Sequence, residues 1–187
     1  MGGTRAETTS DHSTRLGNRR CVSGSRCRDE QSFRTTYKHA ERTVRTVVRN
    51  GYAYQIDARG RTRRVSGELT VADVPIRSRN SQAQAGGAER RASDDGGHYI
   101  AARFDGPTEA FNHFAQDANF NRGGYRVLED EWAREKRAGN TVTVRIVPRF
   151  EGESVRPSVI DVWWTVDGNE KSLKFPNERS ERSRGRR

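Results

Sequence analysis

Apolar and polar side chains alternate along several short stretches of the chain, which is the pattern of half-buried strands. Tyr52 to Asp57 alternates directly after an Asn50-Gly51 turn signal, and Ala58 to Arg61 forms a second turn that leads into an alternating return segment over 63–71. These three features predict a β-hairpin. The same alternation predicts further strands over 141–147, 159–166 and 171–175.

Four other segments have weaker patterns. Residues 43–48 fit either a strand or the end of a short helix that begins near Tyr37. Residues 77–94 are polar and contain Gly86-Gly87, so they predict a loop. The apolar run over 98–104 predicts a strand, and 108–114 predicts one or two helical turns.

The longest helix is predicted from Asn121 to Arg137. Tyr125, Leu128 and Trp132 form an apolar stripe at helical spacing, and Gly139-Asn140 marks the end. Asn121 is placed to cap the helix. Strands followed by a short helix, a longer helix and more strands predict an α+β fold.

Composition limits the size of the ordered part. Only 31% of the residues are hydrophobic and 32% are charged, whereas a packed domain has roughly 45–50% apolar residues when glycine is counted. We therefore expect a disordered segment or linker over 1–31, one domain over 32–175, and a basic disordered tail over 176–187. Trp132, Trp163 and Trp164 are expected in the core, although one of them could instead stack on bases.

The N-terminal segment gives few functional signals. Cys21 and Cys27 allow a small disulfide loop, a metal site with His12 and His39, or two inert thiols. The first twenty residues lack the apolar region of an ordinary signal peptide. There is no run of 18 apolar residues, so no transmembrane helix and no membrane partner are expected.

The charge suggests a polyanionic partner. The chain carries 35 Lys and Arg against 25 Asp and Glu, a net charge of +10, and its only lysines are Lys38, Lys136, Lys171 and Lys174. Arginine binds phosphate in a bidentate manner, so this bias favours nucleic acid. A well-solvated arginine-rich surface explains it equally well. The positive charge lies mostly outside 98–140, and the arginines over 59–64 could be a solvated hairpin tip or a backbone contact.

The candidate chemistry lies in that central segment. His98 follows two glycines, Asn112, Asn119 and Asn121 follow at the mouth of the predicted helix, and Glu129 lies two turns into it. A histidine base, a neutral oxygen ligand and a carboxylate form a plausible hydrolytic set around a hard cation. Taken singly, each of these residues has an ordinary structural interpretation as well, such as a buried histidine or a helix-capping asparagine.

The spacing of these residues resembles a known family. Asp-Gly-Gly-His over 95–98 is similar to the DRGH signature of the DNA/RNA non-specific endonucleases, of the ββα-metal (His-Me finger) type. The family pattern Leu-Asn-x-Gly-x-Trp-x-x-Leu-Glu is matched over 120–129, with Asn112 nine residues before Asn121. The resemblance runs from about Asn50 to Phe175. It is strongest over 94–132 and follows the DDGGH branch, which is frequent in bacterial toxin domains.

There are three departures from the family pattern. Gly96 replaces the arginine of DRGH, so the arginine that contacts the transition state is not identified. Tyr125 replaces the common tryptophan, and Asp117 stands where relatives often have asparagine and is expected to lie in solvent.

The resemblance implies a role for each site residue. It implies an antiparallel sheet with a helix that carries metal-site residues, His98 as the general base, and Asn121 as the protein ligand of Mg²⁺, for which Mn²⁺ could substitute. Glu129 would hold metal-bound waters, Asp95 would orient His98 or the motif backbone, and Asn112 would position the metal environment. The candidate phosphate ligands are Arg103, Arg122 and Arg126.

The implied activity is Mg²⁺-dependent, sugar-non-specific hydrolysis of DNA and RNA that leaves 5′-phosphorylated ends. The resemblance also implies delivery as part of a secreted bacterial toxin and an acidic immunity protein as a partner. Two alternatives stay open from the sequence: a non-catalytic basic nucleic-acid-binding module, and a toxin domain that acts through protein contacts. Preference between DNA and RNA is not encoded in phosphate contacts.

Overall fold

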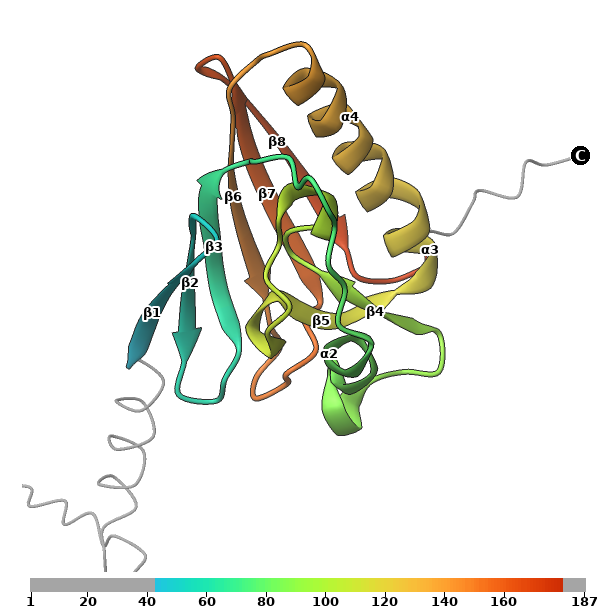
Figure 1. Cartoon of the computed structure of the whole chain (residues 1–187). Helices are drawn as coiled ribbons and strands as arrows, with labels where there is room; N and C mark the ends of the chain where they lie inside the picture. The colour runs from blue at the N-terminus through green and yellow to red at the C-terminus, as the bar shows by residue number, and fades with distance from the viewer. Residues whose placement is uncertain (1–42, 180–187) are drawn as a thin grey trace, which may run out of the picture.

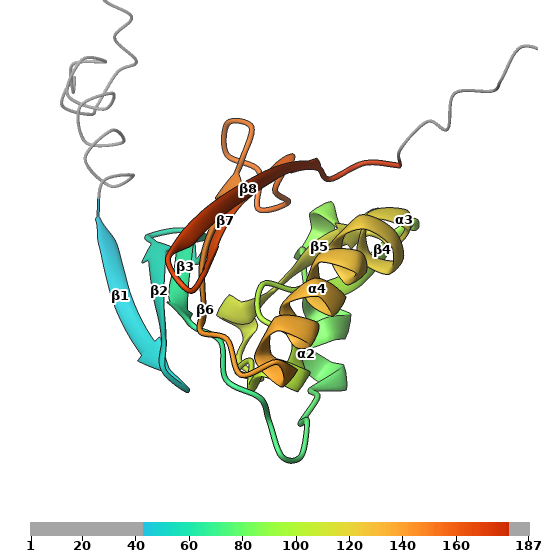
Figure 2. The same ribbon diagram turned by 90° about the horizontal axis from the view of Figure 1, so that it is seen from above.

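The computed structural model describes residues 43–179. These residues form two layers, a six-stranded antiparallel sheet on one side and helices with a two-stranded ribbon on the other (Figure 1). Viewed from above, the curved sheet lies opposite α4, α2 and the β4–β5 ribbon (Figure 2). The predictions for 1–31, for Cys21 and Cys27, and for 180–187 lie outside the described residues.

The large sheet has the strand order β1-β2-β3-β6-β7-β8. Alternation in its strands turns Tyr52, Tyr54 and Ile56 into the core, where each is at most 1% exposed. All the strands predicted for this sheet are confirmed, including the strand alternative for 43–48. Their bounds are β1 Val44–Arg49, β2 Tyr52–Asp57, β3 Thr62–Glu68, β6 Val142–Arg149, β7 Val159–Val166 and β8 Asn169–Pro176.

The ribbon pairs β4 (Asp94–His98) with β5 (His113–Asp117), so His98 ends a strand. The predicted strand over 98–104 is therefore wrong. That apolar run is buried in irregular backbone, and it ends in a 3₁₀ turn over Ala102–Phe104. Its backbone needs no partner strand, because the Asn112 amide accepts from the Ile100 N–H at 3.0 Å and donates to the Ile100 carbonyl at 2.9 Å.

Of two other local predictions, the helical turn over 108–114 is confirmed in part and the loop over 77–94 is wrong. Residues 108–114 hold one 3₁₀ turn, Ala110–Asn112, and then enter β5. The predicted loop over 77–94 contains helix α2 (Arg79–Gln84) and a 3₁₀ turn over Gly87–Glu89. Helix α2 buries none of its residues, so the sequence has no apolar stripe there that could have revealed it.

The second helical region is one continuous stretch. It consists of α3 (Ala118–Phe120), a π-helical turn over Asn121–Tyr125, and α4 (Arg126–Arg137). The N-cap is Asp117, whose carboxylate accepts from the Asn119 and Phe120 amides at 2.9 and 3.2 Å. Asn121 therefore does not cap this helix, and Asp117, at 4% exposure, does not lie in solvent; both expectations were wrong.

The core lies between the sheet and α4. The predicted stripe of Tyr125, Leu128 and Trp132 is buried, and the Trp132 ring packs edge-on against Trp164 with centroids 6.3 Å apart. Trp163 points to the other face of the sheet, where the Arg145 guanidinium lies 4.3 Å from its ring centroid. The prediction that Trp163 is a core residue was therefore wrong, because neighbouring residues of a strand face opposite sides.

The ordered part extends beyond the predicted domain end at 175. Asn177 is fully buried, and its side chain bonds to the Asp117 amide and to the carbonyls of Ala115 and Pro157. It joins the end of β8 to β5. None of the helices among residues 43–179 is both long and apolar enough to cross a membrane.

Candidate active site

A cleft of about 450 Å³ opens between β4, the loop after it and the start of α4. His98, Asn121 and Glu129 all line it, although they are separated in the sequence, and Arg103, Arg122 and Arg126 line it as well. Asp95 and Asn112 do not line the cleft. Asp95 bonds to Asn121, which does line it, whereas Asn112 bonds to Ile100 in the loop after β4. The structure thus brings most of the predicted site together.

His98 and Glu129 face each other. The Nδ1 atom of His98 lies 3.6 Å from Oε1 of Glu129, and both atoms are buried without a hydrogen bond to any described residue. Burial of the imidazole lowers the pKa of His98 below its ordinary value. The ring is therefore neutral near pH 7, which is the form that can accept a proton.

Glu129 is held by an arginine. Burial raises the pKa of its carboxyl to about 7, against the opposing effect of the Arg103 guanidinium. Arg103 donates to Glu129 at 3.2 Å and to Asp130 at 2.7 Å. Since the guanidinium is shared between two carboxylates, Arg103 orients Glu129 and is less free to bind phosphate than the prediction assumed.

Asn121 is oriented by Asp95. The Asn121 side-chain nitrogen donates to Asp95 at 2.9 Å, and Arg122 makes a bidentate pair with the same carboxylate at 2.9 and 2.8 Å. The hydrogen bonds from Arg122 and Asn121 hold the pKa of Asp95 below its ordinary range, so this carboxylate stays charged. It bonds to neither His98 nor the motif backbone, unlike the predicted role, and it leaves the Asn121 oxygen available to a cation.

Asn112 lies deeper in the molecule. It is 1% exposed, accepts from the Tyr54 hydroxyl at 2.9 Å and donates to the Pro107 carbonyl at 2.8 Å, in addition to its bonds with Ile100. These contacts fix the loop that follows His98. Asn112 thus contacts the backbone of the loop after His98 and lines no part of the cleft.

Arg77 was missed by the sequence reasoning. It lines the cleft just before α2 and forms no hydrogen bond or ion pair with any described residue. Only its position in the fold reveals it, because it belongs to no motif. Arg126 is likewise exposed and unpaired among residues 43–179.

The missing motif arginine has a steric explanation. A Cβ atom on Gly96 would lie 2.1 Å from the Gln82 carbonyl oxygen, because the backbone of α2 packs directly against β4 at this point. No side chain fits there. A cation that contacts phosphate must therefore come from another segment, and Arg77 precedes the helix that occupies this space.

The donor set fits a strongly hydrated cation. Among residues 43–179, no three His, Cys, Asp or Glu side chains are grouped closely enough to enclose a metal. Asn121 and Glu129 line one cleft, and neither the Asn121 oxygen nor Glu129 Oε1 has a hydrogen-bond partner among the described residues. This pair suits a cation such as Mg²⁺ that keeps most of its own water ligands. These residues therefore fit the predicted ion.

Residues 41–168 match the family model of the DNA/RNA non-specific endonucleases. The type VII secretion system protein EssD from Staphylococcus aureus strain USA300 is 30% identical over an alignment of 159 residues that covers 80% of this chain. The same protein from strains NCTC 8325 / PS 47 and Newman matches equally. The chain spans about a quarter of the length of these relatives, since the match covers 25% of each.

Two solved nucleases have a similar fold. NucA from Streptococcus agalactiae, solved with a magnesium ion, has a TM-score of 0.50 at 15% identity and covers 80% of this chain and 91% of its own. Sda1 nuclease, solved with a zinc ion, has a TM-score of 0.53 at 14% identity and covers 77% of this chain and 81% of its own. The chain belongs to the DNA/RNA non-specific endonuclease family and is a nuclease with the ββα-metal fold.

Proposed function

We propose that this nuclease is a Mg²⁺-dependent endonuclease that hydrolyses phosphodiester bonds in both DNA and RNA. The observation that carries the proposal is the convergence of His98, Asn121 and Glu129 on one cleft. The family match and the two nuclease structures support it.

His98 accepts the proton of the attacking water at Nδ1, the ring nitrogen that faces Glu129. The lowered pKa keeps the ring available as a base near neutral pH. Once Nδ1 is protonated, the Glu129 carboxylate 3.6 Å away stabilises the positive ring. Arg103 holds Glu129 in that position.

Asn121 binds the ion through its side-chain oxygen, because its nitrogen is occupied by Asp95. Glu129 is placed to hold the ion's water ligands through Oε1. When bound, Mg²⁺ supplies the positive charge that stabilises the phosphorus transition state and the leaving 3′ oxygen, and Mn²⁺ substitutes for it. The magnesium and zinc ions of the two solved nucleases support a divalent cation in this fold.

Arg77 and Arg126 clamp the phosphates that flank the scissile bond, since neither is neutralised by a carboxylate among the described residues. Arg122, which is paired with Asp95, contributes less. Phosphate contacts carry no information about the sugar, which supports cleavage of both DNA and RNA.

The decisive experiment digests plasmid DNA and total RNA side by side, in Mg²⁺ and in EDTA, with wild type, His98→Ala and Asn121→Ala. The expected result is cleavage of both substrates by wild type in Mg²⁺ alone. Both variants should be nearly inactive. Their thermal unfolding midpoints should nevertheless equal that of wild type. Cleavage that survives His98→Ala in the purified protein would contradict the proposed role of His98.

Asn119→Ala is the matched control for Asn121→Ala. Asn119 lies two residues earlier in the same helical stretch, but its side chain is exposed and makes no hydrogen bond to a described residue. It should retain wild-type activity. A loss equal to that of Asn121→Ala would mean that the helix, rather than a metal ligand, had been disturbed.

We further propose that the chain acts as a delivered bacterial toxin with an acidic immunity protein. The similarity to a type VII secretion system protein supports this, as does the net charge of +10. The partner would cover the basic cleft and block the substrate. Expression of wild type should arrest bacterial growth, His98→Ala should be tolerated, and a small acidic protein encoded beside the gene should restore growth. Harmless expression of an active enzyme would contradict the toxin role.

A further inference from the structure

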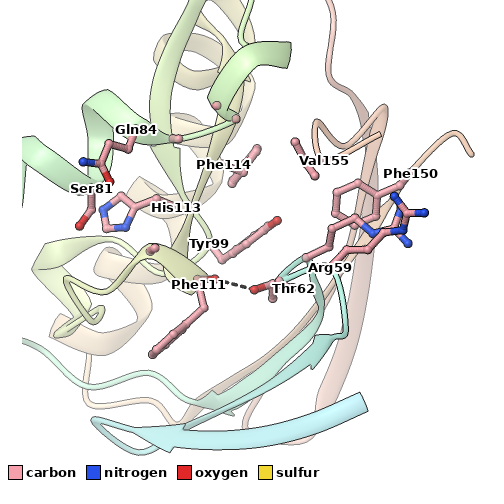
Figure 3. Close-up of a pocket in the computed structure, with 16 residues that line it drawn as sticks. Arg59, Thr62, Ser81, Gln84, Tyr99, Phe111, His113, Phe114, Phe150 and Val155 are labelled. Atoms are coloured by element: carbon pink, nitrogen blue, oxygen red, sulfur yellow. Dashed lines mark hydrogen bonds between the residues drawn. The ribbon is translucent and has the colours of Figure 1, made fainter. Parts of the chain in front are cut away.

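A second pocket, of about 220 Å³, lies close to the cleft (Figure 3). His113 lines it, and His113 is paired directly with His98 across the β4–β5 ribbon. Cross-strand partners lie about 5 Å apart at their Cα atoms. One residue that lines the pocket is therefore the direct cross-strand neighbour of His98, the candidate base. The pocket itself takes no part in the proposed chemistry.

Aromatic rings from separate segments form its walls. Tyr99 and Phe114 stack with centroids 4.5 Å apart and planes inclined by 16°. Phe150 lies across the space from them (Figure 3). Flat aromatic walls of this kind suit a planar aromatic ligand, because each ring offers a face for stacking.

The Tyr99 hydroxyl faces the pocket without a partner among the described residues. Tyr99 is 2% exposed and lines the pocket, yet its hydroxyl bonds to no described residue. The hydroxyls of three other buried tyrosines, Tyr52, Tyr54 and Tyr125, all have acceptors at 2.6 to 2.9 Å. Figure 3 shows the Tyr99 hydroxyl directed toward the side of Phe150 and Arg59. Because this hydroxyl is accessible from the pocket, it is available to hydrogen-bond to the edge of a ligand there.

Arginines lie beside the pocket, and two of them, Arg59 and Arg61, line it. The guanidinium groups of Arg61 and Arg63 lie 5.1 and 5.3 Å from the centroid of Phe150. Arg61 is paired with Asp57 at 2.8 Å, but Arg63 reaches the same carboxylate only at 3.8 Å. Arg59 at the rim pairs with Glu153. Glu89 also lies here, bonded to the Val155 amide, so three carboxylates oppose the three arginines, and Arg63 is the arginine held least closely. A ligand that carries an anionic group beside its ring would meet Arg63.

We infer that this pocket binds one unpaired nucleobase of the substrate strand, close to the scissile phosphate. This inference rests on the proposed endonuclease function. The base would stack against the aromatic walls, its edge would accept from the Tyr99 hydroxyl, and the neighbouring phosphate would meet the arginines at the mouth. A base in a duplex is not free to enter, so single-stranded or locally opened nucleic acid is the favoured substrate.

The test measures kcat/KM on two single-stranded oligodeoxynucleotides of equal length, one with ordinary bases and one in which every nucleotide is a tetrahydrofuran abasic analogue. The variants are Phe150→Ala, which removes a wall, and Tyr99→Phe, which removes only the unpartnered oxygen. Trp163→Ala is the matched control, because Trp163 is a half-buried aromatic on the opposite face of the sheet.

Wild type and Trp163→Ala should favour the oligonucleotide with bases by roughly five- to hundredfold, the range expected for stacking of one base. Phe150→Ala should bring the ratio close to one without slowing cleavage of the abasic strand. Tyr99→Phe should lower the ratio roughly two- to tenfold through the loss of one hydrogen bond.

An unchanged ratio in both pocket variants would overturn the inference, as would equal cleavage of the two strands by wild type. Tyr99→Phe keeps the test valid if Phe150→Ala fails to fold, since it deletes a group with no partner to lose. Failure of the proposed function looks different, because cleavage of either strand would then persist in His98→Ala.

Discussion

Asp94 and Asp95 are neighbours in β4, yet they serve two regions of the molecule that do different things. Asp95 faces the cleft side, where it holds Asn121 and Arg122 and remains partly exposed. Asp94 is buried in a bidentate pair with Arg156, at 2.8 Å for both bonds, and Arg156 also donates to the Asn177 carbonyl. The first region, with His98, Glu129 and Asn121, is the proposed catalytic cleft; the second, Asp94 with Arg156 and Asn177, is the buried anchor.

The comparison shows that adjacent identical residues of one motif need not share a role. Successive side chains of a strand point to opposite faces, so one aspartate meets the helix that carries the site and the other meets the loop before β7. Changes in the catalytic cleft should alter turnover with little effect on stability, and changes in the buried anchor should do the reverse.

The largest effect is expected for His98→Ala. Loss of a general base typically lowers turnover by roughly 10²- to 10⁴-fold, and the Nδ1 atom has no hydrogen-bond partner whose loss would destabilise the fold. Initial rates on plasmid DNA together with a thermal unfolding curve measure both quantities. A variant that is inactive only because it has unfolded would break the distinction between the two regions.

Arg156→Ala should destabilise the protein by about 3–5 kcal/mol, because it leaves the Asp94 carboxylate buried and unpaired. Turnover by the folded fraction at low temperature should stay near wild type. Denaturant titration provides the measurement. Arg149→Ala is the control, since Arg149 pairs with Asp161 at an exposed position and should cost at most about 1 kcal/mol. Equal losses in the two variants would show that burial of the pair is unimportant.

Asp95→Ala should lower the specific activity roughly 10- to 100-fold, the usual cost of removing a group that orients a metal ligand. Stability should hardly change, because the Asp95 side chain is 24% exposed and its partner Arg122 is 72% exposed. Asp95→Asn keeps an oxygen that can accept from Asn121, so it should recover part of the activity. Full activity in Asp95→Ala would mean that Asn121 needs no support.

The smallest effect concerns acid stability. Burial acts to raise the pKa of Asp94, but the hydrogen bonds from Arg156 and from the Arg91 amide outweigh it, and the net shift is downward. A carboxyl whose folded pKa is depressed contributes stability above its ordinary pKa of about 3.9 and loses that contribution as pH falls through the folded pKa. The unfolding free energy of wild type should therefore fall more steeply below about pH 4 than that of Asp94→Asn. If the unfolding free energies of the two proteins change with pH in the same way, the contact between Asp94 and Arg156 does not depend on ionisation of Asp94.

The sequence predicted the large sheet and the long helix because their apolar residues follow the periods of strands and helices. Tyr52 to Asp57 and Tyr125 to Trp132 are examples. Where that period is absent, prediction failed. Helix α2 buries no residue, and the run from Tyr99 to Phe104 is buried at every position except Arg103, so neither segment has an apolar face at a regular spacing.

The candidate site was predicted where motif spacing determines it and missed where only the fold does. His98, Asn121 and Glu129 were found from their order and distance, and the cleft unites them. Arg77 and the pocket beside Tyr99 depend on contacts between distant segments, which no local pattern carries. Asp117 shows the same limit, because its capping role requires knowing that the helix begins at Ala118 rather than at Asn121.

The π-helical turn over Asn121–Tyr125 makes the site sensitive to chain length. Each residue of an ordinary helix advances its side chain by about 100° around the axis. Asn121 lies before this widened turn and Glu129 lies after it, so the turn sets the angular relation between the two. Removing a single residue between them would rotate Asn121 out of the cleft even if every side chain named above were kept. The number of residues between Asn121 and Glu129 therefore matters because it sets the direction of each side chain around the helix axis, and not only because both residues are needed for the chemistry.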